Sequence, residues 1–160
     1  MALNIEAKKA LVAEVNAIAL TAHSAVAAEY RGLTVTEMTA LRSEARNSGV
    51  YLKVVKNTLA RRAVEGTEFE CLRDSLSGPV LLAFSQQDPG SAARIIKGFS
   101  KEHDKLKAVS VSIGGELFGA EDLDRLASLP SLDEARSQLL SVFKAPLSQL
   151  LRTLDEPPAM

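Results

Sequence analysis

The chain has 160 residues, of which 46% are hydrophobic and 24% charged, and its formal net charge is −1. A length of this order suits one core of about 100 to 200 residues with an appendage, and the composition argues against broad disorder. Its apolar runs are far shorter than the ~18 residues of a membrane span, and a charged beginning lacks a signal-peptide pattern. We therefore expect no membrane association and a cytoplasmic location. The single Cys71 excludes an intrachain disulfide.

The charge is unevenly distributed along the chain. Residues 41–66 contain six basic and two acidic side chains, a local charge of +4, whereas residues 120–160 contain four basic and seven acidic side chains, a charge of −3. Because salt screens exposed charges beyond about 8 Å, a distant acidic segment need not cancel a local basic one. Near-neutrality therefore does not exclude binding to nucleic acid.

Hydrophobic spacing predicts an amphipathic helix over 5–20 and a strand over 24–30. Thr34 and Glu37 form a capping box, which predicts a helix over 35–47 that stops at Gly49. A β-rich strand follows over 50–55, and Asn57 is expected to cap a short helix that ends at residue 63.

Two further strands are predicted, over 79–85 and 109–113, with a helix over 91–101 between them. The expected class is α/β, an α+β two-layer plait of about four strands followed by a C-terminal helical extension. An open doubly wound sheet is the alternative. We expect three parts: a folded domain over 1–119, a short helix and linker over 120–130, and a C-terminal helix over 131–160.

The last helix is predicted to begin at a second capping box, Ser131 and Glu134, to kink mildly at Pro146, and to end at the Pro157-Pro158 pair. At about 100° per residue its apolar side chains fall within an arc of about 120°. Two loosely related segments, LSVFKAP and LRTLDEP, repeat at a period of eleven residues. The stripe could pack as a terminal core helix or receive helices of another protein, and the repeat favours the second.

Catalytic and metal-binding patterns are missing from the sequence. His23 and His103 lie far from any nucleophile signature, and the Gly114-Gly115 pair lacks a phosphate-loop pattern. We expect surface or structural roles for both histidines and a buried position for Cys71. No cofactor or metal is predicted. A rival hypothesis, a small α/β enzyme, lacks a recognisable nucleophile, metal set or cofactor loop. A second rival, an RNA-binding module that dimerises through its own leucine stripe, would be separated by a mass measurement.

The strongest charged motif is KVVKNTLARR, residues 53–62, which spans a strand-to-helix junction. Backbone N–H groups at a helix start attract phosphate, and Arg can bridge phosphate oxygens. A solvated basic face is the other interpretation, and periodicity does not choose between them. The same two interpretations apply to Arg31, which lies at the end of a strand before Gly32. They apply also to Lys8 and Lys9, which are weaker candidates for RNA contacts.

Taken together, these residues resemble the bacterial large-subunit ribosomal protein L-ten family. The resemblance is carried by YRGLTVTEMTALRSEARNSGVYLKVVKNTLARRAVEG, FECLRDSLSGPVLLAFSQQDPGSAARIIKGFSKEH, DRLASLP and the Arg152-Thr153-Leu154 segment. It implies a structural protein whose N-terminal domain binds large-subunit ribosomal RNA at the GTPase-associated region, beside ribosomal protein L-eleven. It also implies a C-terminal helix that binds dimers of the stalk protein L-seven/L-twelve, which recruit translational GTPases, and a possible role as repressor of its own messenger RNA.

The resemblance carries the site predictions onto this sequence. Those for ribosomal RNA are Arg31, Lys53, Lys56, Asn57, Arg61 and Arg62. Those for stalk dimers are Leu139, Leu140, Phe143, Leu147, Leu150, Leu151 and Leu154. Because many relatives continue their helix where this chain reads EPPAM, we expect at most two dimers.

Overall fold

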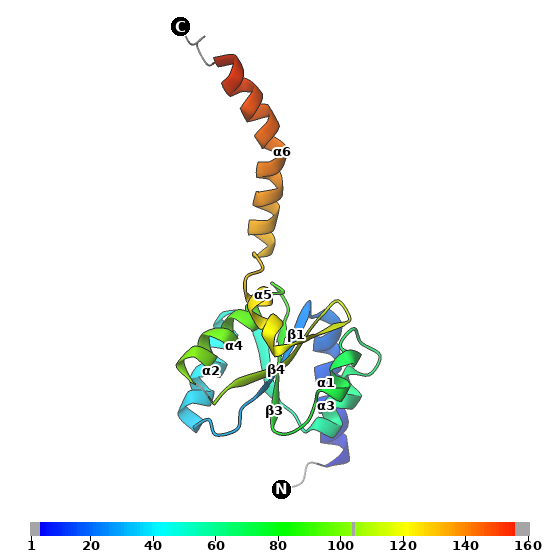
Figure 1. The fold of residues 1–160 in the computed structure, drawn as a ribbon. Helices are drawn as coiled ribbons and strands as arrows, with labels where there is room; N and C mark the ends of the chain where they lie inside the picture. The colour runs from blue at the N-terminus through cyan, green and yellow to red at the C-terminus, as the bar shows by residue number, and fades with distance from the viewer. Residues whose placement is uncertain (1–3, 104, 156–160) are drawn as a thin grey trace. The chain divides into compact units, whose positions relative to one another are not determined.

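The computed structural model describes residues 4–103 and 105–155. The chain divides into two compact units, with the boundary in the sequence between Leu129 and Pro130. The first unit is a mixed α/β domain and the second is a single long helix (Figure 1). We expected the folded domain to end at residue 119. The first unit instead extends ten residues further, because Leu123 and Leu126 of a short helix are buried in its core.

The domain is built on a five-stranded sheet in the order β2-β3-β1-β4-β5. The strands are β1 (Ser24–Glu29), β2 (Val50–Val54), β3 (Val80–Ser85), β4 (Lys107–Ile113) and β5 (Glu116–Gly119). Each pair of neighbouring strands is antiparallel. The predicted α+β class is therefore confirmed, and the doubly wound alternative is wrong because such a sheet would be mostly parallel. The fifth strand follows the Gly114-Gly115 turn and was not predicted.

Helices cover both faces of this sheet, whereas a two-layer plait has them on one. The helical segments of the domain are α1 (Ile5–Thr21), α2 (Val35–Asn47), α3 (Asn57–Val64), η1 (Glu70–Asp74), α4 (Ser91–Glu102), η2 (Ala120–Asp122) and α5 (Leu123–Ala127). Side chains of α2, α4 and α5 share one buried cluster, and those of α1, α3 and η1 share the other. Figure 1 shows the two groups on opposite sides of the strands.

Burial on both faces explains the composition of the central strands. Every residue of β3 is buried, and five of the six residues of β1 are buried. In β1, Val26 faces the α2 and α4 cluster while Ala25 and Ala27 face the α1 and α3 cluster. The small Ala25 and Ala27 share a buried cluster with Val15 and Ala19 of α1 on this second face.

Local capping signals set the helix boundaries. Glu37 N donates to Thr34 Oγ1 over 3.3 Å and Thr34 N donates to Glu37 Oε2 over 2.6 Å, so the predicted capping box is confirmed and α2 has its predicted bounds. Asn57 was expected to cap α3, but the N-cap is Lys56, which makes no side-chain capping bond. The cap prediction was wrong because the Asn57 side chain donates its hydrogen bond to the carbonyl oxygen of Gly78.

The second unit is α6 (Leu132–Asp155), a helix of 24 residues. Its predicted capping box is present: Ser131 N donates to Glu134 Oε2 over 2.9 Å, and Glu134 N donates to Ser131 Oγ over 3.3 Å. The helix continues through Pro146 and curves along its course (Figure 1). Its predicted stop at Pro157-Pro158 lies outside the described residues.

Candidate functional sites

The junction between β2 and α3 presents an uncapped helix start. Leu59 N and Ala60 N donate to the carbonyl oxygen of Lys56, over 2.8 and 2.9 Å, while the earlier amides of α3 receive no side-chain cap. A helix N-terminus carries a partial positive charge and N–H groups that can bind an anion. The exposed side chain of Lys56 lies at this end. The junction is therefore chemically suited to a phosphate group.

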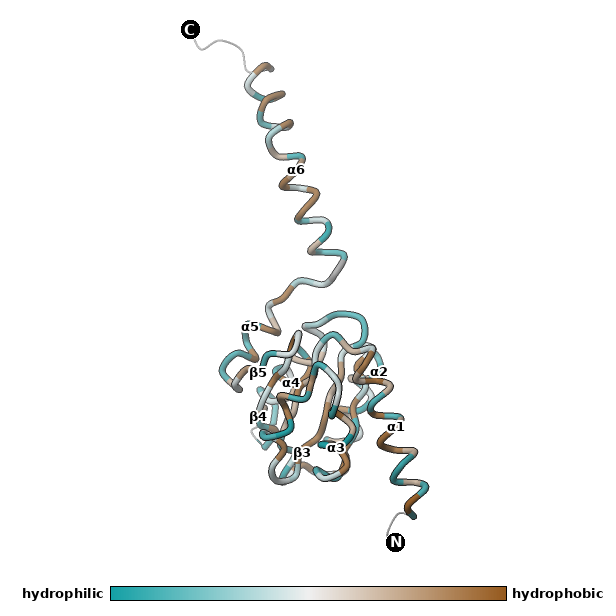
Figure 2. The backbone as a smooth tube through the Cα atoms, turned by 90° about the vertical axis from the view of Figure 1, so that its right-hand side faces the viewer, coloured by the Kyte–Doolittle hydropathy of each residue, from teal (hydrophilic) through white to brown (hydrophobic). Residues whose placement is uncertain are grey.

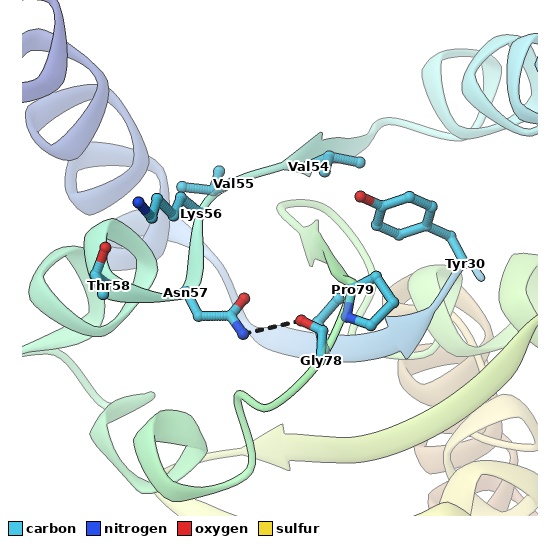
Figure 3. A pocket seen from close by; sticks show the side chains of 9 residues that line it. Tyr30, Val54, Val55, Lys56, Asn57, Thr58, Gly78 and Pro79 are labelled. Atoms are coloured by element: carbon cyan, nitrogen blue, oxygen red, sulfur yellow. Dashed lines mark hydrogen bonds between the residues drawn. The ribbon is translucent and has the colours of Figure 1, made fainter. Parts of the chain in front are cut away.

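Asn57 ties this helix start to the entrance of β3. Its Nδ2 donates to the carbonyl oxygen of Gly78 over 2.9 Å. The bond joins two segments that are 21 residues apart in sequence. Figure 3 shows it in the pocket that Lys56, Asn57 and Thr58 share with Tyr30 and the Gly78-Pro79 pair. In the structure Asn57 therefore positions the junction, and its predicted role as an RNA contact remains a prediction.

Arg61 is held by the backbone of the segment that follows α3. Its Nε donates to the carbonyl oxygen of Arg73 over 3.1 Å, and its Nη2 donates to that of Leu76 over 2.9 Å. Such bonds satisfy carbonyl groups at the end of η1. Arg62, the next residue, is exposed and borders a groove with Lys8 and Lys9 of α1. The two arginines therefore differ, since Arg61 has a structural contact and Arg62 faces solvent beside two further cations.

Lys53 is paired with an acidic residue of α1. Its Nζ donates to Glu14 Oε2 over 2.6 Å, and the hydroxyl of Tyr51 donates to Glu14 Oε1 over 2.6 Å. The hydrogen bonds from Lys53 and then Tyr51 lower the pKa of Glu14. Partial burial is the largest single influence and acts to lower the pKa of Lys53, but the hydrogen bonds and charges of Glu14 and Tyr51 together outweigh it, and the pKa is raised. Lys53 therefore stays charged, and its charge is paired with that of Glu14. Its position in the sequence did not indicate this ion pair.

Arg31 is exposed in the turn that follows β1. Leu33 N donates to the carbonyl oxygen of Tyr30 over 3.2 Å, and Gly32 adopts a φ of +90°, which a residue with a side chain rarely adopts. A Cβ added at Gly32 would lie 3.5 Å from Cδ of Lys105. The turn thus brings Lys105 beside the Arg31 segment. Sequence reasoning missed Lys105 because 74 positions separate the two residues and the intervening fold brings them together.

The predicted apolar stripe of α6 is exposed along its length. Phe143 is 67% exposed and Leu147 is 65% exposed. Figure 2 shows hydrophobic positions recurring along α6 between hydrophilic ones. The exposed stripe residues are Leu139, Leu140, Phe143, Leu147, Leu150, Leu151 and Leu154. Large exposed apolar surfaces usually mark a binding site for another macromolecule.

Histidine, cysteine and acidic residues form no catalytic or metal-binding arrangement in the described ranges. There, no group of three or more such side chains could hold a metal ion. His103 Nδ1 lies 3.3 Å from Glu37 Oε1 at the surface of the domain. Cys71, which we expected to be buried, is partly exposed, and its Sγ lies 3.0 Å from Ser112 Oγ. Its place on the short η1 segment, at the margin of the sheet, explains the difference. Within the same ranges, no helix has the length and apolar character of a membrane span.

The fold and these surfaces define a class of binding protein: a mixed α/β domain with a cationic strand-to-helix junction, followed by a helix with an exposed apolar face. The family described as "Ribosomal protein L10" matches residues 3–101, and "Ribosomal protein uL10 C-terminal region" matches residues 129–155. The chain belongs to the L10 (uL10) family of large-subunit ribosomal proteins.

Named relatives support this membership over almost the whole chain. It is 63% identical to "Large ribosomal subunit protein uL10" of Thioalkalivibrio sulfidiphilus over 158 residues, which cover 99% of this chain and 90% of the relative. It is 60% identical, with the same coverage, to the protein of that name from Alcanivorax borkumensis. The chain is therefore a structural component of the large ribosomal subunit in the cytoplasm, and it is not an enzyme.

Proposed function

We propose that the α/β domain binds large-subunit ribosomal RNA at the GTPase-associated region, beside ribosomal protein L-eleven. The observation that carries this proposal is the uncapped N-terminus of α3 with the exposed Lys56 at its start. Phosphate contacts of this kind position a protein on folded RNA. The proposed contact residues are Arg31, Lys53, Lys56, Asn57, Arg61 and Arg62.

The structure divides these residues by their availability. Arg31, Lys56 and Arg62 are exposed, whereas Lys53 would have to exchange Glu14 for a phosphate. Arg61 can contribute its charge to the RNA while two of its N–H groups remain bound to the backbone. Lys56 and Arg62 are therefore the residues on which a direct test should rest.

The test is a double substitution, Lys56→Glu with Arg62→Glu, in the full chain. We expect it to weaken binding to a fragment of the GTPase-associated RNA by at least about tenfold, because two phosphate contacts become repulsive. Binding of stalk dimers and the melting temperature should stay unchanged. The matched control is Arg125→Glu, a cation of α5 on the opposite side of the sheet. Unchanged RNA affinity in the double variant would refute the cationic junction as the RNA site.

We propose further that α6 binds the N-terminal dimerisation domains of the L-seven/L-twelve stalk protein, and so supports recruitment of translational GTPases. The proposal rests on the exposed stripe from Leu139 to Leu154. An amphipathic helix commonly lays its apolar face into a groove made by partner helices. The eleven-residue repeat within α6 supports two dimers, one on each repeat.

Removal of α6 tests this second proposal. A chain that ends at Pro130 retains the whole first unit and should lose stalk dimers completely while it still binds RNA. Mass measurement of the purified full chain with stalk protein should give the number of dimers. Stalk dimers that co-purify with the shortened chain would rule out α6 as their binding site.

We also propose that the RNA-binding surface can hold the chain's own messenger RNA and repress its translation. The support is indirect, since one cationic surface would serve both RNAs. A leader segment of the messenger RNA should compete with the ribosomal RNA fragment for the protein. Simultaneous binding of both RNAs to one chain would contradict a shared surface.

A further inference from the structure

Three segments that are distant in sequence enclose one pocket beside the α3 N-terminus. Tyr30 comes from the end of β1, residues 54–58 come from the β2 to α3 junction, and residues 78–80 lead into β3. The pocket has a volume of about 430 Å³. Figure 3 shows Tyr30 on one side and Lys56, Asn57 and Thr58 on the other, with Gly78 and Pro79 between them.

Hydrogen bonds hold the walls of this pocket together. Tyr30 N donates to the carbonyl oxygen of Pro79 over 3.3 Å, and Asn57 Nδ2 donates to that of Gly78 over 2.9 Å. The Tyr30 side chain is half-buried and packs against the core cluster that contains α2 and α4. The pocket is therefore preformed, so binding of an occupant would not carry the entropy cost of ordering its walls.

The lining has the composition of a site for a flat, mostly apolar group. Val55 and Val80 are buried, while the ring of Tyr30 and the ring of Pro79 are partly exposed. The polar side chains are Lys56, Asn57 and Thr58 on one side and the hydroxyl group of Tyr30 on the other. Small-ligand sites commonly combine apolar walls with a few polar groups that set orientation. A heterocyclic base that stacks on Tyr30 would satisfy both features, with its phosphate near Lys56.

We propose that this pocket receives a single unstacked base of the bound RNA, held against the ring of Tyr30. The inference rests on the proposed RNA-binding function and adds to it the kind of RNA feature recognised. Proteins that recognise folded RNA commonly take unpaired bases out of the stack and hold them on aromatic side chains. Elsewhere in the domain, Phe69 and Phe84 are fully buried and the hydroxyl of Tyr51 is bound to Glu14, so Tyr30 is better placed than these rings.

The first test compares Tyr30→Leu with Tyr30→Phe in the full chain. Leucine keeps an apolar side chain against the core but removes the aromatic face, and we expect it to weaken binding of the ribosomal RNA fragment about 5- to 150-fold. Phenylalanine keeps the ring and should bind within about twofold of the original protein. Equal affinities of all three proteins would overturn the inference.

Salt dependence separates stacking from electrostatics. Tyr30→Leu removes no charge, so the slope of log affinity against log salt should not change, whereas Lys56→Ala should reduce its magnitude by about 1. A reduced slope for Tyr30→Leu would mean that the variant displaces the phosphate contacts, and this would count against a base in the pocket. Unchanged melting temperatures should accompany both results.

A fluorescent base gives the direct measurement. We would place 2-aminopurine at each unpaired position of the RNA fragment in turn, and we expect one position to change its fluorescence on binding the original protein but not Tyr30→Leu. The absence of any such position, while the RNA still binds, would overturn the inference alone. Failure of the original protein to bind the RNA would instead overturn the proposed function. Adenosine monophosphate should bind far more weakly than the RNA, and equal affinity would make the pocket a nucleotide site.

Discussion

Gly90, directly before α4, has no space for a side chain. A Cβ added there would lie 2.9 Å from the carbonyl oxygen of Leu126 and 3.3 Å from that of Leu129. Both oxygens belong to the backbone around the end of α5, so neither can move away cheaply. The φ of Gly90 is −84°, which any residue can adopt. The need for glycine is therefore one of space, and it arises from the packing of α5 against α4.

We predict that Gly90→Ala lowers the free energy of unfolding by about 1 to 3 kcal/mol, because the added methyl group overpacks the contact with α5. The matched control is Gly98→Ala within α4, where a Cβ would meet no atom within 4 Å. Alanine is the better helix former, so the control should raise the same free energy by about 0.5 to 1 kcal/mol. Denaturant unfolding measures both changes, and a stabilising Gly90→Ala would contradict the close contact.

The Glu14, Tyr51 and Lys53 cluster makes a pH-dependent contribution to stability. The pKa of Glu14 is lower in the folded chain than its ordinary value of 4.5, because Lys53 and then Tyr51 donate to it. A lowered carboxyl pKa stabilises the fold above the unfolded-state value, and this contribution is lost as the pH falls through the folded-state value.

We predict that the stability difference between the original chain and Glu14→Gln is constant near neutral pH and shrinks as the pH falls below about 4.5. The raised pKa of Lys53 keeps its ammonium charged, so the difference should persist until the pH rises above the ordinary lysine value of 10.5. Urea unfolding over this range measures the effect, which should be small for exposed groups. A difference that grows in acid would contradict the assignment.

At the scale of the element, α6 carries its apolar side chains without burying them. Successive stripe positions recur at three- and four-residue spacing, so they share one face of the helix. Val142 is also exposed, at 68%, but at 100° per residue it projects about 60° outside the arc that begins at Leu139. Adjacent residues of this helix therefore differ in whether they belong to the stripe.

We predict that Phe143→Ala weakens binding of stalk dimers roughly 30-fold, about 2 kcal/mol, as expected for a large aromatic anchor at the centre of an interface. Val142→Ala should change the affinity less than about threefold, although both side chains are similarly exposed. Calorimetric titration gives the affinities, and circular dichroism checks that α6 remains helical. Equal losses for the two variants would place the interface on a different face of α6.

Over the whole molecule, net charge is a poor guide to partners. The chain has 19 basic and 20 acidic side chains, yet the cations of residues 53–62 lie around one strand-to-helix junction. Exposed acids far from the junction are screened by salt at physiological ionic strength. A nearly neutral protein can therefore bind a polyanion through one local surface, and the two proposed interactions should respond differently to salt.

We predict that raising the salt concentration fourfold weakens RNA binding roughly 60-fold, which corresponds to a log–log slope of about −3 for four neutralised phosphates. Binding of stalk dimers through the apolar stripe should change less than about twofold over the same range. Parallel titrations of one protein preparation measure both. A flat response of the RNA complex would exclude phosphate neutralisation as the main source of its affinity.

The sequence alone determined the features that depend on neighbouring residues. The capping boxes at Thr34 and Ser131 and the apolar period of the last helix are local signals, and together with the β-rich runs they predicted the mixed α/β domain and its helical extension correctly. The family resemblance was likewise readable from contiguous motifs. Local signals suffice for these features because hydrogen bonds within a turn and side-chain periodicity act over a few residues.

Only the tertiary structure decided which charged and polar groups are available to a partner. In the folded chain Lys53 forms an ion pair with Glu14, and Arg61 donates hydrogen bonds to carbonyl oxygens that follow α3. Asn57 does not cap α3, and its side chain instead donates a hydrogen bond to the carbonyl oxygen of Gly78. The tertiary structure also placed α1 and α3 on the second face of the sheet and brought Tyr30 to the pocket beside Lys56. The hydrogen bonds of Lys53, Arg61 and Asn57 join residues that are between 12 and 39 positions apart. Such distant pairs are set by how the sheet folds and not by the pattern within any one segment.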